Sequence, residues 1–222
     1  MATLRKAEQP TLLADAGELL RGALQAPADG SFAVMVTGGT TPLELYRRLA
    51  AQPFPVHPLA HVAVSDERVV PLAAPESNYG HLRGLLDALA LPETRRLYVH
   101  PDEGLEAAAA RYDAELAALR AAGGRLTLAL LGLGADGHVA SLFRAADVAA
   151  GAGRCAIPVP RPAPPARVSV TADLLRQAER VVFLVQGAAK REAVERLLYA
   201  PATIPAGLVF AAHPAVEVWW SV

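Results

Sequence analysis

The sequence predicts an α/β protein built on a mainly parallel sheet, with helices covering both faces of that sheet. Short apolar runs such as Phe32–Val36 lack polar alternation, which is typical of strands buried on both faces. Segments with helical periodicity separate these runs along the chain. In addition, the segments with unusual polar chemistry directly follow predicted strands, and open α/β sheets bind ligands at the carboxyl ends of their strands.

The predicted elements alternate along the chain. The first helix spans 11–24, where leucines and alanines repeat along one stripe. The strand at 32–36 leads into a helix over 43–51, for which Thr41 is the expected N-cap and Pro42 the first helical residue. Five prolines make 158–165 an extended connection. The remaining predicted strands are 60–64, 126–131, 181–185 and 216–220, and the remaining predicted helices are 106–122 and 188–198.

Length and composition limit the class of protein. A chain of 222 residues with 53% hydrophobic residues predicts one domain with its own core. Lys and Arg number 21 against 22 Asp and Glu, so a basic field for nucleic acid or acidic membranes is not expected. The single cysteine, Cys155, excludes an internal disulfide. With no signal-peptide pattern at the first residues and no long apolar run, we expect a cytoplasmic protein.

A glycine-rich turn follows the strand at 32–36. Gly38 and Gly39 allow backbone N–H groups to approach an anion, and Thr40 and Thr41 add hydroxyl groups at the start of a helix. The spacing and the lysine of a P-loop are missing. An anion-binding loop and a tight capped turn both remain open on this motif alone.

Three charged residues, Asp66, Glu67 and Arg68, follow the strand at 60–64. If this strand end lines a crevice, Arg68 has the fork geometry to bind an anion through two hydrogen bonds. Asp66 is then a candidate to orient a base or to bind sugar hydroxyls. A solvated loop is the alternative interpretation of the three charges.

The segment Gly132–His138 contains the spacing G-x-G-x-x-G. A dinucleotide site also needs a helix directly after the motif and an acidic residue about 20 positions on, so that interpretation is rejected. His138 remains as a histidine on a loop at a strand end, with Asp136 two residues before it. An imidazole is the natural general base near neutral pH. No spacing of histidines and cysteines predicts a metal site.

Two further cations complete the candidate site. Arg167 precedes the segment Val168–Thr171, and Lys190 stands at the start of the helix at 188–198. A lysine in the first turn opposes the helix dipole, which a bound anion would offset. A surface lysine on an amphipathic helix is the other interpretation.

Taken together, these motifs resemble those of the 6-phosphogluconolactonase family, the lactonase branch of the glucosamine/galactosamine-6-phosphate isomerases. The resemblance runs in order through T-G-G-T-T-P, D-E-R-V-V-P, L-G-L-G-A-D-G-H-V-A-S-L-F, R-V-S-V-T and G-A-A-K, from about Phe32 to Lys190. It implies a single Rossmann-like domain of the deaminase/lactonase type over 1–222. It also implies hydrolysis of 6-phospho-D-glucono-1,5-lactone to 6-phosphogluconate without a metal or another cofactor.

Roles for individual residues follow from the resemblance. His138 matches the catalytic base, with Asp66 and Asp136 as the acidic residues near it. The substrate and phosphate ligands are matched by Gly38, Gly39, Thr40, Arg68, Arg167 and Lys190. The expected partner is the small sugar-phosphate lactone, with no nucleic acid or membrane, and the protein is expected to be a monomer or a small homo-oligomer.

Two alternatives stay open. A deaminase-isomerase acts on the same sugar-phosphate framework, but it calls for carboxylates around the histidine, and no acidic residue occurs between His138 and Asp147. A non-catalytic sugar-phosphate sensor needs the cations without the base. The lactonase blocks usually have a proline after Phe143, where this sequence has Arg144, so the path of this loop is not predicted.

Overall fold

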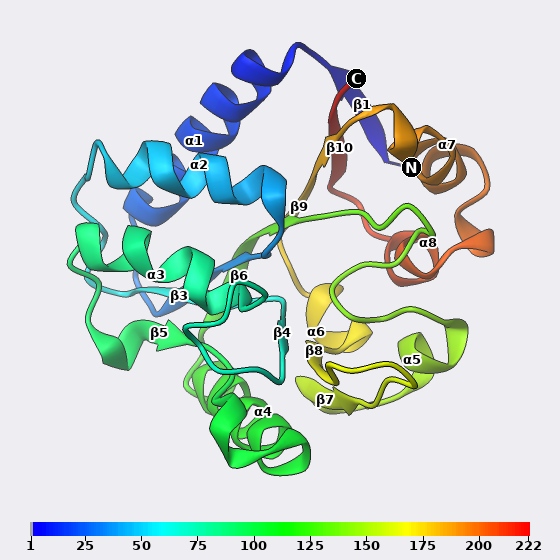
Figure 1. Ribbon diagram of the computed structural model, residues 1–222. Helices are drawn as coiled ribbons and strands as arrows, with labels where there is room; N and C mark the ends of the chain where they lie inside the picture. Colours follow the sequence, from blue (N-terminus) through cyan, green and yellow to red (C-terminus); the bar gives the residue numbers. More distant parts are fainter. Residues whose placement is uncertain (1) are drawn as a thin grey trace.

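A seven-stranded sheet organises the molecule (Figure 1). The computed structural model describes residues 2–222, apart from the side chain of Thr40. The strand order is β1-β10-β9-β6-β2-β3-β5, and each pair of neighbours is parallel, which confirms the predicted fold class. The strands are β1 (Thr3–Lys6), β2 (Phe32–Val36), β3 (Ala60–Val64), β5 (Arg96–Leu97), β6 (Arg125–Leu131), β9 (Arg180–Gln186) and β10 (Val216–Ser221).

The predicted apolar strands form the centre of this sheet. β2 is buried along its whole length, as its lack of polar alternation predicts. The bounds of β2 and β3 agree with prediction, and β6, β9 and β10 extend one residue further at one or both ends. The edge strand β1 is exposed throughout and contains no apolar run, so its sequence gives little indication of a strand.

Helices cover both faces of the sheet. Figure 1 shows α1, α2 and α3 on one side, and α4, α7 and α8 on the other. No helix among the described residues is long and apolar enough to cross a bilayer. The helices are α1 (Gln9–Gln25), α2 (Thr40–Ala50), α3 (Asn78–Ala88), α4 (Leu105–Ala121), α5 (Ala145–Ala149), α6 (Ala172–Leu175), α7 (Arg191–Tyr199) and α8 (Pro205–Phe210).

The predicted start of α2 is wrong. The helix begins at Thr40, with Gly39 as its N-cap, so Thr41 is a helical residue and Pro42 the third residue of the helix. Pro42 is tolerated there because the first turn of a helix has no intrahelical partner for its N–H groups. The Thr41 hydroxyl donates instead to Gln186 Oε1 at 2.9 Å, which ties the start of α2 to the end of β9.

A second, three-stranded antiparallel sheet follows the order β4-β8-β7 and was not predicted. Its strands are β4 (Asp66–Arg68), β8 (Arg167–Val170) and β7 (Ala156–Val159). They are short, and β4 consists entirely of charged residues, so neither periodicity nor an apolar run indicates them. The strand β7 also contains the first two residues of the predicted extended connection, which leaves 160–166 outside regular structure.

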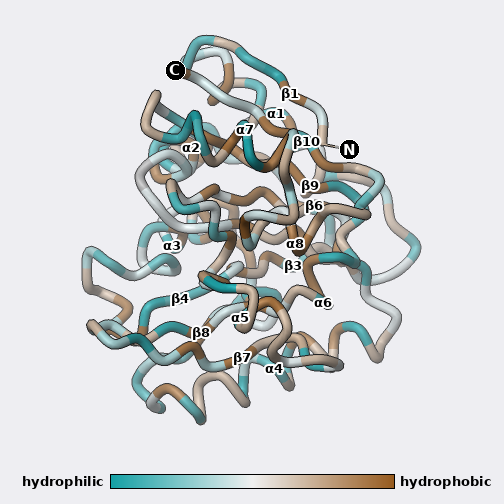
Figure 2. Tube along the Cα trace, turned by 90° about the vertical axis from the view of Figure 1, so that its right-hand side faces the viewer, coloured by the Kyte–Doolittle hydropathy of each residue, from teal (hydrophilic) through white to brown (hydrophobic). Residues whose placement is uncertain are grey.

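The hydrophobic core lies around the central strands, where Figure 2 shows the most hydrophobic segments. Two fully buried tyrosines anchor strand ends within it. The Tyr46 hydroxyl donates to the Thr37 carbonyl at 2.6 Å, and the Tyr112 hydroxyl donates to the Val64 carbonyl at 2.6 Å. Both carbonyls stand where a strand of the large sheet ends, so these bonds fix the backbone at the edge where ligands bind in this architecture.

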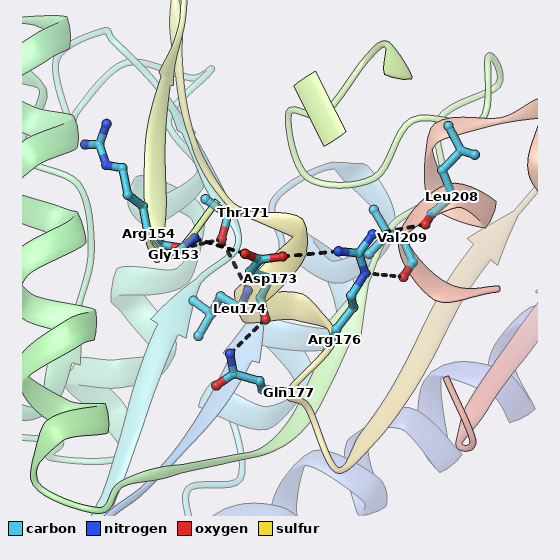
Figure 3. A network of polar contacts seen from close by, with 9 residues as sticks. All are labelled: Gly153, Arg154, Thr171, Asp173, Leu174, Arg176, Gln177, Leu208 and Val209. Atoms are coloured by element: carbon cyan, nitrogen blue, oxygen red, sulfur yellow. Dashed lines mark hydrogen bonds and ion pairs between the residues drawn. The ribbon is translucent and has the colours of Figure 1, made fainter. Parts of the chain in front are cut away.

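A polar network joins α6 to α8 and to the loop before β7 (Figure 3). The Arg176 guanidinium donates to the carbonyls of Val209 and Leu208, at 3.1 and 3.2 Å, near the end of α8. It also bonds Asp173 Oδ1 at 3.2 Å, while Asp173 Oδ2 accepts the N–H of Gly153 at 3.0 Å. Arg176 therefore links three segments that adjoin the second sheet.

We expect Arg176→Ala to lower the free energy of unfolding by about 1–3 kcal/mol, because it leaves carbonyl and carboxylate acceptors without their charged donor. Urea denaturation followed by circular dichroism measures this change. Arg83→Ala is the matched control, because this more exposed arginine pairs, among the described residues, only with Asp87 of the same helix; it should change stability by less than about 0.5 kcal/mol. Equal stability of the two variants would contradict the anchoring role of Arg176.

Candidate active site

A cavity of about 660 Å³ lies at the carboxyl ends of β2, β6 and β9, beside β4 and β8 of the second sheet. The polar segments that follow the predicted strands thus lie together at one edge of the sheet. Asp136 contacts the His138 imidazole. The side chain of Thr40 lies outside the described part of the chain. The predicted site residues that line the cavity are Gly38, Gly39, Asp66, Arg68, His138, Arg167 and Lys190.

His138 and Asp136 form a close pair. The distance between His138 Nδ1 and Asp136 Oδ1 is 2.5 Å, and the His138 side chain is 30% exposed. Burial alone would raise the pKa of Asp136, but the hydrogen bond from the His138 backbone N–H and the attraction of the imidazole lower this pKa overall. A carboxylate at Nδ1 selects the tautomer in which Nε2 accepts a proton. The pair therefore has the geometry of an oriented general base.

Gly134 makes room for this pair. A Cβ atom at Gly134 would lie 2.1 Å from His138 Nδ1 and 2.5 Å from Asp136 Oδ1, so a side chain there displaces the imidazole or the carboxylate. The Gly134 N–H also donates to the His138 carbonyl at 2.9 Å, which closes the loop into a tight turn. No helix begins within 132–144, as the rejection of a dinucleotide site expected.

Arg68 and Arg167 face each other across β4 and β8, where they are partners in the ladder. The Nε of each guanidinium is buried and has no hydrogen-bond partner among the described residues. Burial, followed by the repulsion from Arg68, lowers the pKa of Arg167. Buried donors in native proteins are normally paired, so two adjacent cations with free donors indicate a site for an anion.

Glu67 is a site residue whose role the sequence did not reveal. Its side chain is fully buried, which rules out the solvated loop as an interpretation of the three charges. Its carboxylate accepts the N–H groups of Asn78 and Tyr79, both at 2.8 Å, and of Arg68 at 2.7 Å. Burial raises the pKa of Glu67, and these hydrogen bonds oppose that rise. Glu67 thereby joins the start of α3 to the strand that bears Arg68.

Asp66 lines the cavity but does not orient His138. Its two carboxylate oxygens accept the hydroxyls of Ser65 at 2.9 Å and Ser141 at 2.7 Å. The sequence left open whether Asp66 or Asp136 holds the base, and the structure places Asp136 at the imidazole. Asp66 remains at the cavity wall, where a sugar hydroxyl is the ligand its carboxylate suits.

The glycine-rich turn packs against Arg68 through Asn78. A Cβ atom at Gly38 would lie 1.8 Å from Asn78 Oδ1, the atom that accepts from Arg68 Nη1 at 2.9 Å. Gly38 is therefore required for the approach of the turn to the arginine. On the opposite wall, Lys190 ends a short 3-10 turn directly before α7. Among the described residues, Lys190 forms no ion pair, which leaves its ammonium group available to an anion.

Arg144 takes part in the start of α5. Its guanidinium bonds Asp147 Oδ1 at 2.8 Å, and Asp147 Oδ2 accepts the backbone N–H groups of Phe143 and Arg144, both at 3.0 Å. These reciprocal contacts fix the path of the loop at Arg144, which the sequence did not predict. The first acidic residue after His138 is thus engaged in capping a helix.

The fold and the cavity define a Rossmann-like α/β protein in which a histidine–aspartate pair stands beside an anion site formed by two arginines. A family model described as glucosamine-6-phosphate isomerases/6-phosphogluconolactonase matches residues 7–220, and the chain belongs to this family. The 6-phosphogluconolactonase of Thermotoga maritima is 34% identical over 192 residues, which are 84% of this chain and 82% of that protein. The 6-phosphogluconolactonase of Mycobacterium bovis is 34% identical over 215 residues, with coverages of 88% and 85%.

A solved structure shares the whole architecture. The crystal structure of 6-phosphogluconolactonase from Thermotoga maritima superimposes with a TM-score of 0.80 at 28% sequence identity, covering 100% of this chain and 99% of that chain. The structural similarity therefore includes both the parallel sheet and the small antiparallel sheet that supplies Arg68 and Arg167.

Proposed function

We propose that the protein hydrolyses 6-phospho-D-glucono-1,5-lactone to 6-phospho-D-gluconate, the second reaction of the oxidative pentose phosphate pathway. The observation that carries this proposal is the placement in one cavity of the His138–Asp136 pair and of Arg68 and Arg167, whose Nε groups have no hydrogen-bond partner among the described residues. The names of the relatives support the lactone as substrate.

The reaction needs a proton to move from water to the ring oxygen that leaves C1, and it needs the negative charge on the carbonyl oxygen to be stabilised. A lactone carbonyl is activated enough for direct attack by water, so no covalent nucleophile is required. His138 takes a proton from that water through Nε2 as the oxygen attacks C1, while Asp136 holds the imidazolium that forms. The imidazolium then returns the proton to the ring oxygen as the C1–O bond breaks. Backbone N–H groups or a guanidinium at the cavity wall stabilise the developing oxyanion.

The phosphate supplies binding energy far from the reacting carbon. Arg68, Arg167 and Lys190 are the cations that we assign to this dianion, with the turn at Gly38 and Gly39 beside it. Binding a remote group orients the lactone against the base, which lowers the entropic part of the barrier. The domain proposed for this activity spans 1–222, and its cytoplasmic location and oligomeric state stay predictions.

The deaminase-isomerase alternative receives no comparable support. Its proton shuttling calls for a carboxylate near the histidine in addition to its partner. Asp147, the first acidic residue after His138, does not line the cavity and is held by Arg144. Asp66 does line the cavity, but its two carboxylate oxygens accept the hydroxyls of Ser65 and Ser141. A sensor without catalysis would not need the oriented imidazole.

The test is a coupled assay in which glucose-6-phosphate dehydrogenase generates the lactone and its disappearance is compared with spontaneous hydrolysis. We expect the purified protein to accelerate the loss of the phosphorylated lactone and to act poorly on unphosphorylated gluconolactone. Release of ammonia from glucosamine 6-phosphate is measured in parallel. Ammonia release without lactone turnover would favour the isomerase, and binding of 6-phosphogluconate with neither activity would favour the sensor.

We expect Arg167→Ala and Lys190→Ala to raise KM more than they lower kcat. Each removes a charge-assisted contact worth about 1.5–3 kcal/mol, which corresponds to a rise in KM of roughly tenfold to a hundredfold. Steady-state kinetics at fixed ionic strength separates the two constants, and Arg83→Ala, which lies outside the cavity, controls for lost surface charge. A fall in kcat at unchanged KM would contradict the assignment of these cations to substrate binding.

A further inference from the structure

Three side chains from two segments lie against one another beside the cavity. The Arg161 guanidinium lies 3.8 Å from the centre of the Phe143 ring. The centre of that ring lies 4.6 Å from the centre of the His138 imidazole, with 47° between the two planes. The Phe143 ring therefore contacts both a cation and the imidazole that we assign as the base.

The backbone of Phe143 is held independently of this stack. Its N–H donates to Asp147 Oδ2 at 3.0 Å, and Asp147 is fixed in turn by the Arg144 guanidinium. The ring is partly buried and packs against the hydrophobic core. A ring on so constrained a backbone can restrict the rotation of the imidazole it touches, whereas a flexible apolar side chain would not.

Arg161 belongs to the connection 160–166 between β7 and β8. Prolines at 160, 162, 164 and 165 restrict the backbone of this segment, and β8 follows with Arg167 in the cavity. The Arg161 side chain is exposed, and it forms no ion pair with any described carboxylate. Its guanidinium and the ring of Phe143 have the arrangement of a cation–π pair.

We propose that Phe143 is a positioning residue for His138, and that Arg161 holds Phe143 against the imidazole. Asp136 fixes the imidazole at Nδ1 within its own loop. Phe143 contacts the imidazole from a later position on the same loop, and Arg161 holds Phe143 from the connection between β7 and β8. The inference rests on the proposed function only in taking His138 as the base, because the stacking itself is independent of the substrate.

The experiment compares variants of the full chain in steady-state turnover of the phosphorylated lactone. We expect Phe143→Leu to lower kcat about tenfold to a hundredfold with little change in KM, the scale of a slightly misplaced catalytic group. Arg161→Ala is expected to lower kcat about threefold to fivefold, as the loss of an exposed cation–π pair allows. Phe143→Tyr and Arg161→Lys keep the ring or the charge and should recover most of kcat.

A matched control exists at Arg21 on α1, whose guanidinium lies 4.5 Å from the centre of the Phe54 ring, outside the cavity. Arg21→Ala removes the same kind of contact and should leave kcat and KM unchanged. The double variant Phe143→Leu/Arg161→Ala should lower kcat by no more than Phe143→Leu alone does, because Arg161 acts through Phe143. Additive losses would overturn the clamp, and an unchanged kcat in folded Phe143→Leu would overturn the positioning role.

A second readout needs no substrate. The 15N shifts of the His138 ring, assigned with His138→Gln, report its tautomer and ordering in the free protein. We expect one Nδ1–H tautomer in the wild type and averaged or shifted signals in Phe143→Leu. If the wild type fails to hydrolyse the lactone yet these shifts respond, the proposed function is wrong while the positioning role stands. Identical shifts in both proteins would refute the positioning role whatever the activity.

Discussion

His138→Ala is expected to lower kcat for the phosphorylated lactone by about two to four orders of magnitude, the range for a lost general base. The substitution removes the group that takes a proton from water, and it leaves Arg68 and Arg167 in place. Affinity for 6-phosphogluconate, measured by calorimetry, should therefore change little. Rapid-mixing kinetics must be corrected for spontaneous hydrolysis, which sets the lower limit of the measurement.

A control histidine separates this effect from general damage. His61 lies on β3, away from the cavity, and His61→Ala should keep wild-type kcat. If His138→Ala also retains kcat while remaining folded, the base lies elsewhere. Loss of product affinity in that variant would instead indicate that His138 binds the substrate.

Gly134→Ala is expected to cost about a hundredfold in kcat, close to the effect of misplacing a catalytic group by 1 Å. The added Cβ atom would stand 2.1 Å from His138 Nδ1, so the imidazole must leave its position against Asp136. Steady-state kinetics and a urea titration of the same sample show whether activity falls while the fold remains.

Gly132→Ala is the matched comparison for this prediction. A Cβ atom at Gly132 would lie 3.7 Å from Thr37 Cγ2, an ordinary contact, so its cost in kcat should be far smaller. Equal losses in the two variants would mean that flexibility of the loop, rather than space for the imidazole, is what the glycines provide.

The sequence predicted the central sheet well, because burial on both faces leaves a continuous apolar run that is visible without a structure. The second sheet was not predicted because β4 and β8 are short, and because their charged residues serve the cavity instead of the core. Arg68 and Arg167 were each identified as candidate cations from their positions beside strands. Their pairing across a ladder depends on contacts between distant segments, which periodicity does not report.

In the candidate site too, features that are local in sequence were predicted and features that depend on tertiary contacts were not. His138 and Asp136 were expected together because they are two residues apart on one loop. The buried role of Glu67 and the contact of Arg161 with Phe143 were missed, since both depend on the tertiary arrangement of loops. Three charges directly after a buried strand were the signal available for Glu67. A cap at Thr41 was predicted wrongly because Thr41 instead bonds Gln186 on a strand distant in sequence.

The opposed guanidinium groups of Arg68 and Arg167 have a thermodynamic consequence. The ladder holds the two groups opposite each other, so they repel in the free protein. A dianion that neutralises both of them can bind only the folded chain, because only the fold brings them together. Ligand occupancy then adds RT ln(1 + [L]/Kd) to the stability of the fold. The proposed assignment of both cations to the phosphate therefore predicts a melting temperature that rises with the concentration of sugar phosphate.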